Sequence, residues 1–158
     1  MNSSIFLGNI LKRLNKIYTV YEYKSLSRNL TSISDFRIKN YNNFKTEIIG
    51  SNNLVFNKYG YSKNIIYSNN ILTAFVVFWK PFSETPIHRH ASNGCHVLKI
   101  DGTWQEELYK NDGIIESRGL TSGNVCFIDN SIGKHKMYYT GNDMGVSLNI
   151  YSPTAEID

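Results

Sequence analysis

Three of the four histidines in the chain and one of its two cysteines stand in one short stretch, PIHRHASNGCHV, at residues 86–97. In an extended segment, side chains two residues apart point to the same side. His88 and His90 would then face one way, and Arg89 between them would face the other. Imidazoles are good ligands for zinc, copper, iron and nickel. The spacing therefore predicts a metal site.

The third ligand of such a site has to come from a distant part of the chain. His135, at the end of the segment DNSIGKH, is the available candidate. His96 is closer in sequence, but it directly follows Cys95, and neighbouring strand residues point to opposite faces. We therefore expect His96 not to be a ligand. Three histidines leave coordination positions open, as in a catalytic site. The alternative is that these histidines are surface or core residues without a metal.

The chain from about residue 54 onwards predicts β-strands. Residues 72–79, LTAFVVFW, are nearly all apolar and rich in β-branched and aromatic side chains, which is typical of a strand buried on both faces. Shorter strands are expected at 95–100, 103–109, 125–128, 136–140 and 146–151. Asp101-Gly102 predicts a type I′ hairpin between the strands 95–100 and 103–109. This spacing favours a sandwich or a small barrel.

The first 50 residues predict helices instead. Apolar residues recur at intervals of three and four, which is a helical pattern; they are Ile5, Leu7, Ile10, Leu11, Leu14, Ile17 and Tyr18. A second short helix is expected within residues 36–48. We expect the helices of about residues 1–50 to cover one face of a β-barrel formed by about residues 54–153. Because no repeat or linker interrupts the chain, the sequence predicts a single domain over residues 1–158.

Composition narrows the classes of function. The chain has 158 residues and a net charge of +4, but its lysines and arginines are scattered, so we expect no nucleic-acid partner. Two cysteines do not make a disulfide framework. The N-terminal residues lack the pattern of a signal peptide, and no apolar stretch approaches the ~20 residues that cross a bilayer. We therefore expect a reduced, cytoplasmic protein without a membrane partner.

The last predicted strand has one polar and one apolar face, because Ser147, Asn149 and Tyr151 alternate with apolar residues. A polar face turned into a barrel lines a cavity, whereas one turned outward meets solvent. The alternation alone leaves both orientations open.

Several motifs, taken in order, resemble the cysteine dioxygenase family. Residues 61–64, Tyr-Ser-Lys-Asn, are similar to the family's Tyr-Thr-Arg-Asn, and residues 87–90 with Cys95 are similar to Ile-His-Asp-His and its following cysteine. Residues 129–135 resemble Asn-Asp-Ser-Ile-Gly-Leu-His, and residues 146–153 resemble Val-Ser-Leu-His-Leu-Tyr-Ser-Pro. The resemblance covers nearly the whole chain. It implies a mainly β cupin fold, a small jelly-roll barrel with N-terminal helices packed on it.

The resemblance also implies a site and an activity. His88, His90 and His135 would bind Fe(2+), and Cys95 and Tyr151 would be joined by a thioether beside the iron. The implied reaction uses O2 to oxidise L-cysteine, or a related small carboxylate-bearing thiol, to the sulfinic acid. We expect a monomer whose partners are the thiol and O2. The alternatives for Cys95 and Tyr151 are burial as a small apolar residue and packing in the core, respectively.

Two positions depart from the family pattern. Lys63 stands where the family has the arginine that binds the carboxylate, and an ammonium cannot form a guanidinium's two parallel hydrogen bonds. Asn149 stands where the family has a histidine; its amide forms hydrogen bonds but cannot take up or release a proton near neutral pH. With Tyr61 and Ser147, these two complete the expected substrate contacts. The departures leave the identity of the thiol open.

Two other functions remain open. An iron cupin oxygenase acting on a different metabolite would keep the three histidines and explain the changes at Lys63 and Asn149. A metal- or ligand-binding cupin without catalysis would keep the histidines but would not need Cys95 beside Tyr151.

Overall fold

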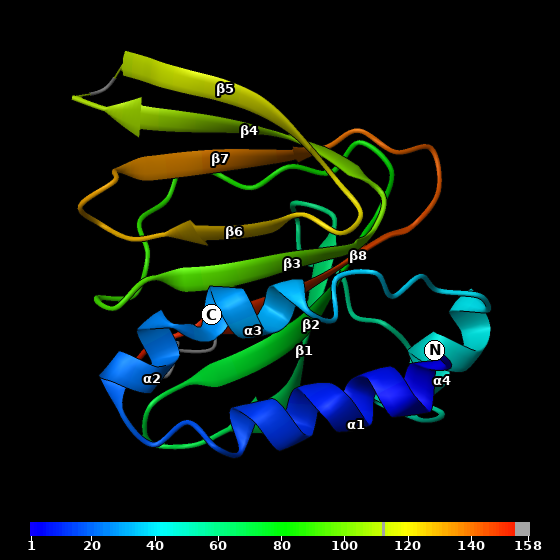
Figure 1. Cartoon of the computed structure of the whole chain (residues 1–158). Helices are drawn as coiled ribbons and strands as arrows, with labels where there is room; N and C mark the ends of the chain where they lie inside the picture. The colour runs from blue at the N-terminus through cyan, green and yellow to red at the C-terminus, as the bar shows by residue number, and fades with distance from the viewer. Residues whose placement is uncertain (112, 154–158) are drawn as a thin grey trace.

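The computed structural model describes residues 1–111 and 113–153. Helices precede strands along the chain (Figure 1). The helices are α1 (Ser3–Leu14), α2 (Val20–Lys24), α3 (Leu26–Thr31) and α4 (Tyr41–Ile49). The strands are β1 (Tyr61–Ser68), β2 (Thr73–Trp79), β3 (Cys95–Asp101), β4 (Thr103–Lys110), β5 (Gly113–Thr121), β6 (Val125–Ile128), β7 (Lys134–Tyr139) and β8 (Gly145–Tyr151). None of the helices described is both long and apolar enough to cross a membrane.

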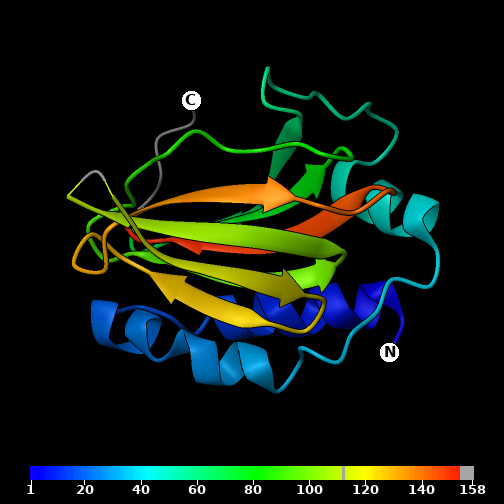
Figure 2. The same cartoon turned by 90° about the horizontal axis from the view of Figure 1, so that it is seen from above.

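The strands form two antiparallel sheets that face each other. One sheet has the order β1-β2-β8-β3-β6 and the other has the order β5-β4-β7. Figure 1 shows the helices against the outer face of the five-stranded sheet, and Figure 2 shows the same layers from above. The predicted mainly β jelly roll with N-terminal helices is confirmed, although the two sheets do not close into one continuous barrel.

Strand β2 is buried on both faces, as its apolar sequence predicts. Every one of its seven residues is buried. Ala74, Val76 and Phe78 pack in the apolar cluster shared with the helices, while the alternate residues Phe75 and Trp79 belong to a second cluster between the two sheets. The strand therefore separates the helical layer from the space between the sheets.

The helical layer differs in detail from the prediction. The buried residues of α1 are Phe6, Ile10 and Leu14, whereas Ile5, which was expected on the buried face, is 53% exposed and Tyr18 is 68% exposed. The buried stripe follows a spacing of four residues from Phe6, so it is rotated relative to the predicted one. Helices α2 and α3 form in a stretch where the sequence pattern predicted none. A capping box between Thr19 and Glu22 begins α2.

The predicted hairpin at Asp101-Gly102 is wrong. Strand β3 lies in the five-stranded sheet and β4 lies in the three-stranded sheet, so the two strands are not paired. Gly102 has a φ of +122°, a conformation that favours glycine, and its N–H donates a hydrogen bond to Ser122 Oγ at 3.0 Å. The glycine therefore carries the chain from one sheet to the other.

A second glycine, Gly94, sets the start of β3. Its φ is +89°, and a Cβ atom placed there would lie 2.6 Å from Phe127 Cζ and 2.7 Å from the carbonyl oxygen of Ile128. The hydroxyl of Tyr23, from α2, donates to the Gly94 carbonyl at 2.7 Å. This close packing fixes where the next residue, Cys95, enters the sheet.

We predict that Gly94→Ala destabilises the protein by about 1–3 kcal/mol, because the new Cβ meets its neighbours in a backbone conformation that L-residues avoid. Gly8→Ala is the matched control, since a Cβ there meets nothing within 4 Å; in the middle of α1 it should be neutral or stabilising by about 0.5–1 kcal/mol. Urea unfolding of both variants measures the difference. Equal stabilities would contradict this role of Gly94.

Candidate metal centre

Two of the three predicted ligands are brought together by the backbone. His88 and His135 form an isolated antiparallel bridge. The N–H of His88 donates to the carbonyl of His135 at 3.0 Å, and the N–H of His135 donates back at 3.1 Å. Apart from this bridge, residues 86–93 form no strand, so the strand-like alternation on which the pairing of His88 with His90 was predicted is wrong, although both histidines reach the site.

His90, the remaining predicted ligand, is held through its backbone, which forms two hydrogen bonds with the side chain of Asn130. The N–H of His90 donates to Asn130 Oδ1 at 3.1 Å, and Asn130 Nδ2 donates to the carbonyl of His90 at 3.0 Å. Asn130 lies in the loop between β6 and β7, which leads directly to His135. Arg89, between the two histidines, is exposed and lies at the rim of the cavity described below.

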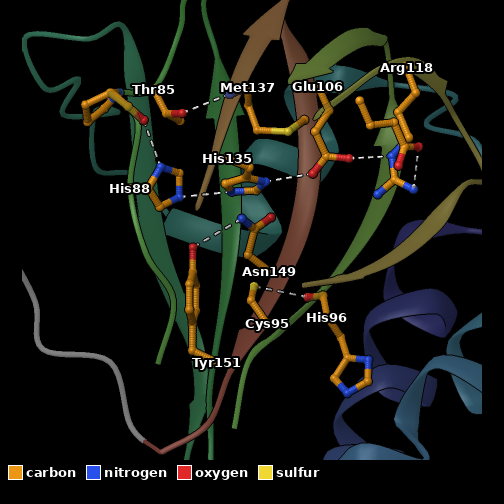
Figure 3. A network of polar contacts seen from close by, with 12 residues as sticks. Thr85, His88, Cys95, His96, Glu106, Arg118, His135, Met137, Asn149 and Tyr151 are labelled. Atoms are coloured by element: carbon orange, nitrogen blue, oxygen red, sulfur yellow. Dashed lines mark hydrogen bonds and ion pairs between the residues drawn. The ribbon is translucent and has the colours of Figure 1, made fainter. Parts of the chain in front are cut away.

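The three imidazoles form a compact cluster. The centroid of the His135 ring lies 4.5 Å from that of His88 and 4.4 Å from that of His90. One nitrogen from each ring can be chosen so that all three lie within 4.8 Å of one another. Figure 3 shows His88 and His135 pointing toward each other from the two sides of the site.

The hydrogen bonds of two rings determine which nitrogens remain free. His88 Nδ1 lies 2.9 Å from the carbonyl oxygen of Pro86, and His135 Nδ1 lies 2.7 Å from Glu106 Oε1. Both partners only accept, so each Nδ1 carries the hydrogen. In neutral imidazoles the two Nε2 atoms then present lone pairs to each other, 3.1 Å apart. A cation bound between them would remove that repulsion.

His90 supports the same interpretation. Both of its ring nitrogens are buried, and neither has a hydrogen-bond partner among residues 1–111 and 113–153. Buried polar atoms are nearly always paired, so such a ring next to two convergent lone pairs fits a metal ligand. The donor set of three imidazoles suits iron, zinc, copper or nickel.

Burial keeps His88 and His90 neutral. Desolvation, with the neighbouring His135 as the next cause, lowers the pKa of His88 to about 4 and that of His90 to about 2. Both rings are therefore unprotonated at neutral pH, which is the form that binds a metal.

Glu106, on β4, holds His135 in place. Its carboxylate is 2% exposed, and it pairs with Arg118 on β5, whose Nε lies 2.6 Å from Oε2. Burial alone would raise the pKa of Glu106, but the hydrogen bonds from His135 and Arg118 outweigh it and lower that pKa to about 2. An ionised carboxylate on Nδ1 orients a histidine ligand and makes it more basic.

Sequence reasoning missed both Glu106 and Arg118. The signal that could have found them is the alternation in β4, where an acidic residue stands between the inward-facing Trp104 and Leu108. An acid on an otherwise apolar strand face requires a buried partner.

Cys95 and Tyr151 lie side by side. They are direct partners in the pairing of β3 with β8, and Cys95 is fully buried. Burial raises the pKa of the Cys95 thiol to about 12, against an opposing hydrogen bond from Tyr151, and burial together with the neighbouring Cys95 raises the pKa of Tyr151. The Tyr151 ring lies nearly parallel to that of His90, with the ring centroids 6.5 Å apart. The pair therefore stands next to the three histidines.

A cavity of about 480 Å³ opens between the two sheets at this cluster. Its walls include the three histidines, Cys95 and Tyr151, together with three of the predicted substrate residues, which are Tyr61, Lys63 and Asn149. Ser147 is not among the described residues that line it. Its hydroxyl donates to Asn149 Oδ1 at 2.8 Å and accepts from Trp79 Nε1 at 3.0 Å. Ser147 therefore orients the amide of Asn149 without itself lining the cavity.

The amide of Asn149 is oriented toward the phenol. Because its Oδ1 accepts from Ser147, its Nδ2 points to the Tyr151 hydroxyl oxygen at 3.4 Å, as Figure 3 shows. The phenol hydrogen is left to point elsewhere. Lys63 lies at the exposed side of the cavity, with its ammonium 5.5 Å from the centroid of the Tyr151 ring.

The fourth histidine, His96, lies on the opposite face of β3. Its Nδ1 is 2.6 Å from Ser27 Oγ, and its ring packs edge-on against Tyr23 at 4.7 Å. It is part of the contact between the helices and the sheet, away from the other three histidines.

Comparison with solved structures agrees with the fold. KdgF from Halomonas sp. matches with a TM-score of 0.55 at 18% identity, over 67% of this chain and 92% of that one. An RmlC-like cupin from Shewanella frigidimarina matches with a TM-score of 0.52 at 17% identity, over 67% of this chain and 87% of that one. At these identities the likeness establishes the cupin fold alone.

The family comparison covers most of the chain. The family described as cysteine dioxygenase type I matches residues 37–157. This range includes all three clustered histidines, the Cys95–Tyr151 pair and Lys63. The chain belongs to the cysteine dioxygenase type I family.

Proposed function

We propose that this protein is a thiol dioxygenase that uses Fe(2+) held by His88, His90 and His135. The substrate is L-cysteine or a related small thiol with a carboxylate, and the product is the sulfinic acid. The thiol and O2 combine without any other reactant, since R–SH and O2 together contain the atoms of R–SO2H. The observation that carries the proposal is the convergence of three imidazoles next to the Cys95–Tyr151 pair.

The protein groups have separate tasks in this proposal. When bound, iron would supply open coordination positions and lower the pKa of a thiol that reaches them. Lys63, whose charge is felt at His88 and His90, attracts the anionic substrate to the mouth of the cavity. Tyr151 donates a hydrogen bond into the cavity, because its oxygen already accepts from Asn149. The buried side chains Val97 and Leu108 exclude water.

A thioether between Cys95 and Tyr151 belongs to the same proposal. The Cys95 sulfur would bond to a ring carbon of Tyr151, and each residue would lose one hydrogen to O2 as the oxidant. The link would hold the phenol beside the metal. The Tyr151 side chain would then lose less conformational entropy when a substrate binds. The pairing of the two residues across β3 and β8 supports this step.

The proposed working unit is a monomer in a reducing cytoplasm, and its partners are the thiol and O2. The free state of Cys95 and Cys126 is compatible with such a compartment.

The first test is oxygen consumption by Fe(2+)-loaded protein with a panel of thiols, followed by mass spectrometry of the products. We expect a sulfinate that carries two oxygen atoms from labelled O2 with at least one carboxylate-bearing thiol. His135→Ala should reduce the rate to background, because it removes a ligand. Absence of a sulfinate from every thiol would reject the proposal in favour of a different oxygenase or a binding protein.

The second test is the intact mass of protein purified from aerobic culture. A thioether lowers the mass by two hydrogen atoms, and we expect a fraction of the molecules to show this loss. Cys95→Ser should abolish the loss, whereas Cys126→Ser should retain it, since Cys126 is not the strand partner of Tyr151. A mass loss that survives Cys95→Ser would argue against the link.

The third test concerns Glu106. We predict that Glu106→Gln lowers Fe(2+) affinity by about 10- to 100-fold, because the neutral amide orients His135 less firmly and makes it less basic. Glu107→Gln is the matched control; that carboxylate accepts hydrogen bonds from Tyr109 and Tyr138 and does not contact His135. Competition with a metal-binding dye measures both affinities. An unchanged affinity in Glu106→Gln would exclude this role.

A further inference from the structure

Lys99, on β3, is a buried cation that the proposed function does not use. It is 2% exposed and lines the same cavity as the three histidines. Its ammonium lies over the ring of Trp104, 4.7 Å from the ring centroid. Among residues 1–111 and 113–153, no side chain or carbonyl forms a hydrogen bond or ion pair with it. A buried ammonium in that state is costly, because no anion replaces its water.

Glu106, the carboxylate that acts on Lys99, is not free to pair with it. Glu106 favours the charged form of Lys99, but its two oxygens are engaged by His135 and Arg118 at 2.7 and 2.6 Å. Burial lowers the pKa of Lys99 to about 8, so the side chain remains mostly protonated at neutral pH. The cavity therefore contains a positive charge that Glu106, already paired with Arg118, does not neutralise.

The backbones of Lys99 and Lys63 both lie away from the metal end of the cavity, but the Lys63 side chain reaches back toward it, with its ammonium 5.5 Å from the centroid of the Tyr151 ring, whereas the Lys99 ammonium lies over Trp104. Lys63, Val77, Ser147 and Lys99 form one row across β1, β2, β8 and β3, whereas Cys95 and Tyr151 form a row four residues along. Four residues of a strand span about 13 Å. The opposite wall has the same spacing, because Trp104 pairs with Tyr139 while Leu108 pairs with His135.

The size of the cavity agrees with this separation. Cavities of about 300–1,000 Å³ hold ligands of drug size, and about 480 Å³ is more room than the few heavy atoms of cysteine require. Lys63 is exposed near Tyr151, whereas Lys99 is enclosed next to Trp104. The two cations can therefore bind anionic groups at different distances from the histidines.

We propose that the Lys99 ammonium binds an acidic group of the substrate, and that the substrate is therefore a thiol whose acidic group is separated from sulfur by a longer chain than in cysteine. This inference rests on the proposed function, since it assumes that the thiol binds at the three histidines. Lys99 would then select substrates by the distance between their sulfur and their acidic group. Lys63 would attract the substrate and contact any acidic group close to the sulfur.

The test is anaerobic titration of the Fe(2+)-loaded protein with straight-chain mercaptocarboxylates of increasing length. Without O2 there is no turnover, so calorimetry reports binding alone. We expect the affinity to pass through a maximum at a chain longer than that of cysteine. At that maximum, Lys99→Met should weaken binding by about tenfold or more, because a charge-assisted hydrogen bond is lost. The shortest member of the series should be nearly unaffected.

Lys63→Met is the matched variant. It should weaken the binding of the short mercaptocarboxylates at least as much as the binding of the long ones. A thermal melt tests whether Lys99 has only a structural role. Lys99→Met should be as stable as the wild type or more stable, since the substitution removes an unpaired buried charge. Equal binding of the long thiols by wild type and Lys99→Met would overturn the proposal, as would an equal loss at every length. A length-dependent loss without sulfinate formation in the oxygen assay would retain the Lys99 site and reject the dioxygenase.

Discussion

The buried carboxylate of Glu106 is the constraint on which the site depends. An ion that is 2% exposed costs several kcal/mol unless it is paired, and its partners Arg118 and His135 come from the two strands on either side of β4. By accepting from His135 Nδ1, the carboxylate leaves Nε2 as the ligand atom. One ion pair thus links the three-stranded sheet to the protonation state of the metal site.

The opposite wall is organised by strand alternation. In β8 the residues Asn149 and Tyr151 face the cavity while Leu148 and Ile150 face the helices. Tyr23 connects the two layers, because its hydroxyl lies 2.7 Å from the Gly94 carbonyl and 2.8 Å from that of Ile150. These two residues directly precede Cys95 and Tyr151. The helical layer therefore helps to hold the paired cysteine and tyrosine in register.

Much of this arrangement could be predicted from local pattern. The apolar run of β2, the polar alternation of β8 and the two histidines at 88 and 90 are all visible in short windows, because each reflects the periodicity of a strand or the chemistry of one motif. The crossing at Gly102 could not be predicted, since a glycine after an aspartate fits a hairpin equally well. Its packing against the Tyr139 ring, where a Cβ atom would lie 2.5 Å from Cε2, appears only in the folded structure.

The polar partners of the site were harder to predict for a related reason. Glu106, Arg118 and Lys99 are charged residues in strands, and most such residues face solvent. The alternation of β4 places Glu106 on the same face as Trp104, but the burial of that face and the two partners of Glu106 become visible only in the packed sheets. A charge on an inward position therefore marks function only after the register is known.

The charges of the cavity determine what kind of substrate it suits. Three imidazoles add no negative charge to a divalent metal, and Glu106 is balanced by Arg118. Lys63 and Lys99 then leave an excess of positive charge that an anionic ligand would neutralise. A single arginine would recognise a carboxylate by the planar geometry of its two hydrogen bonds. In the proposed function, two ammonium groups at different depths would recognise instead how far an acidic group lies from the metal, so that the exposed Lys63 and the buried Lys99 would together set the specificity.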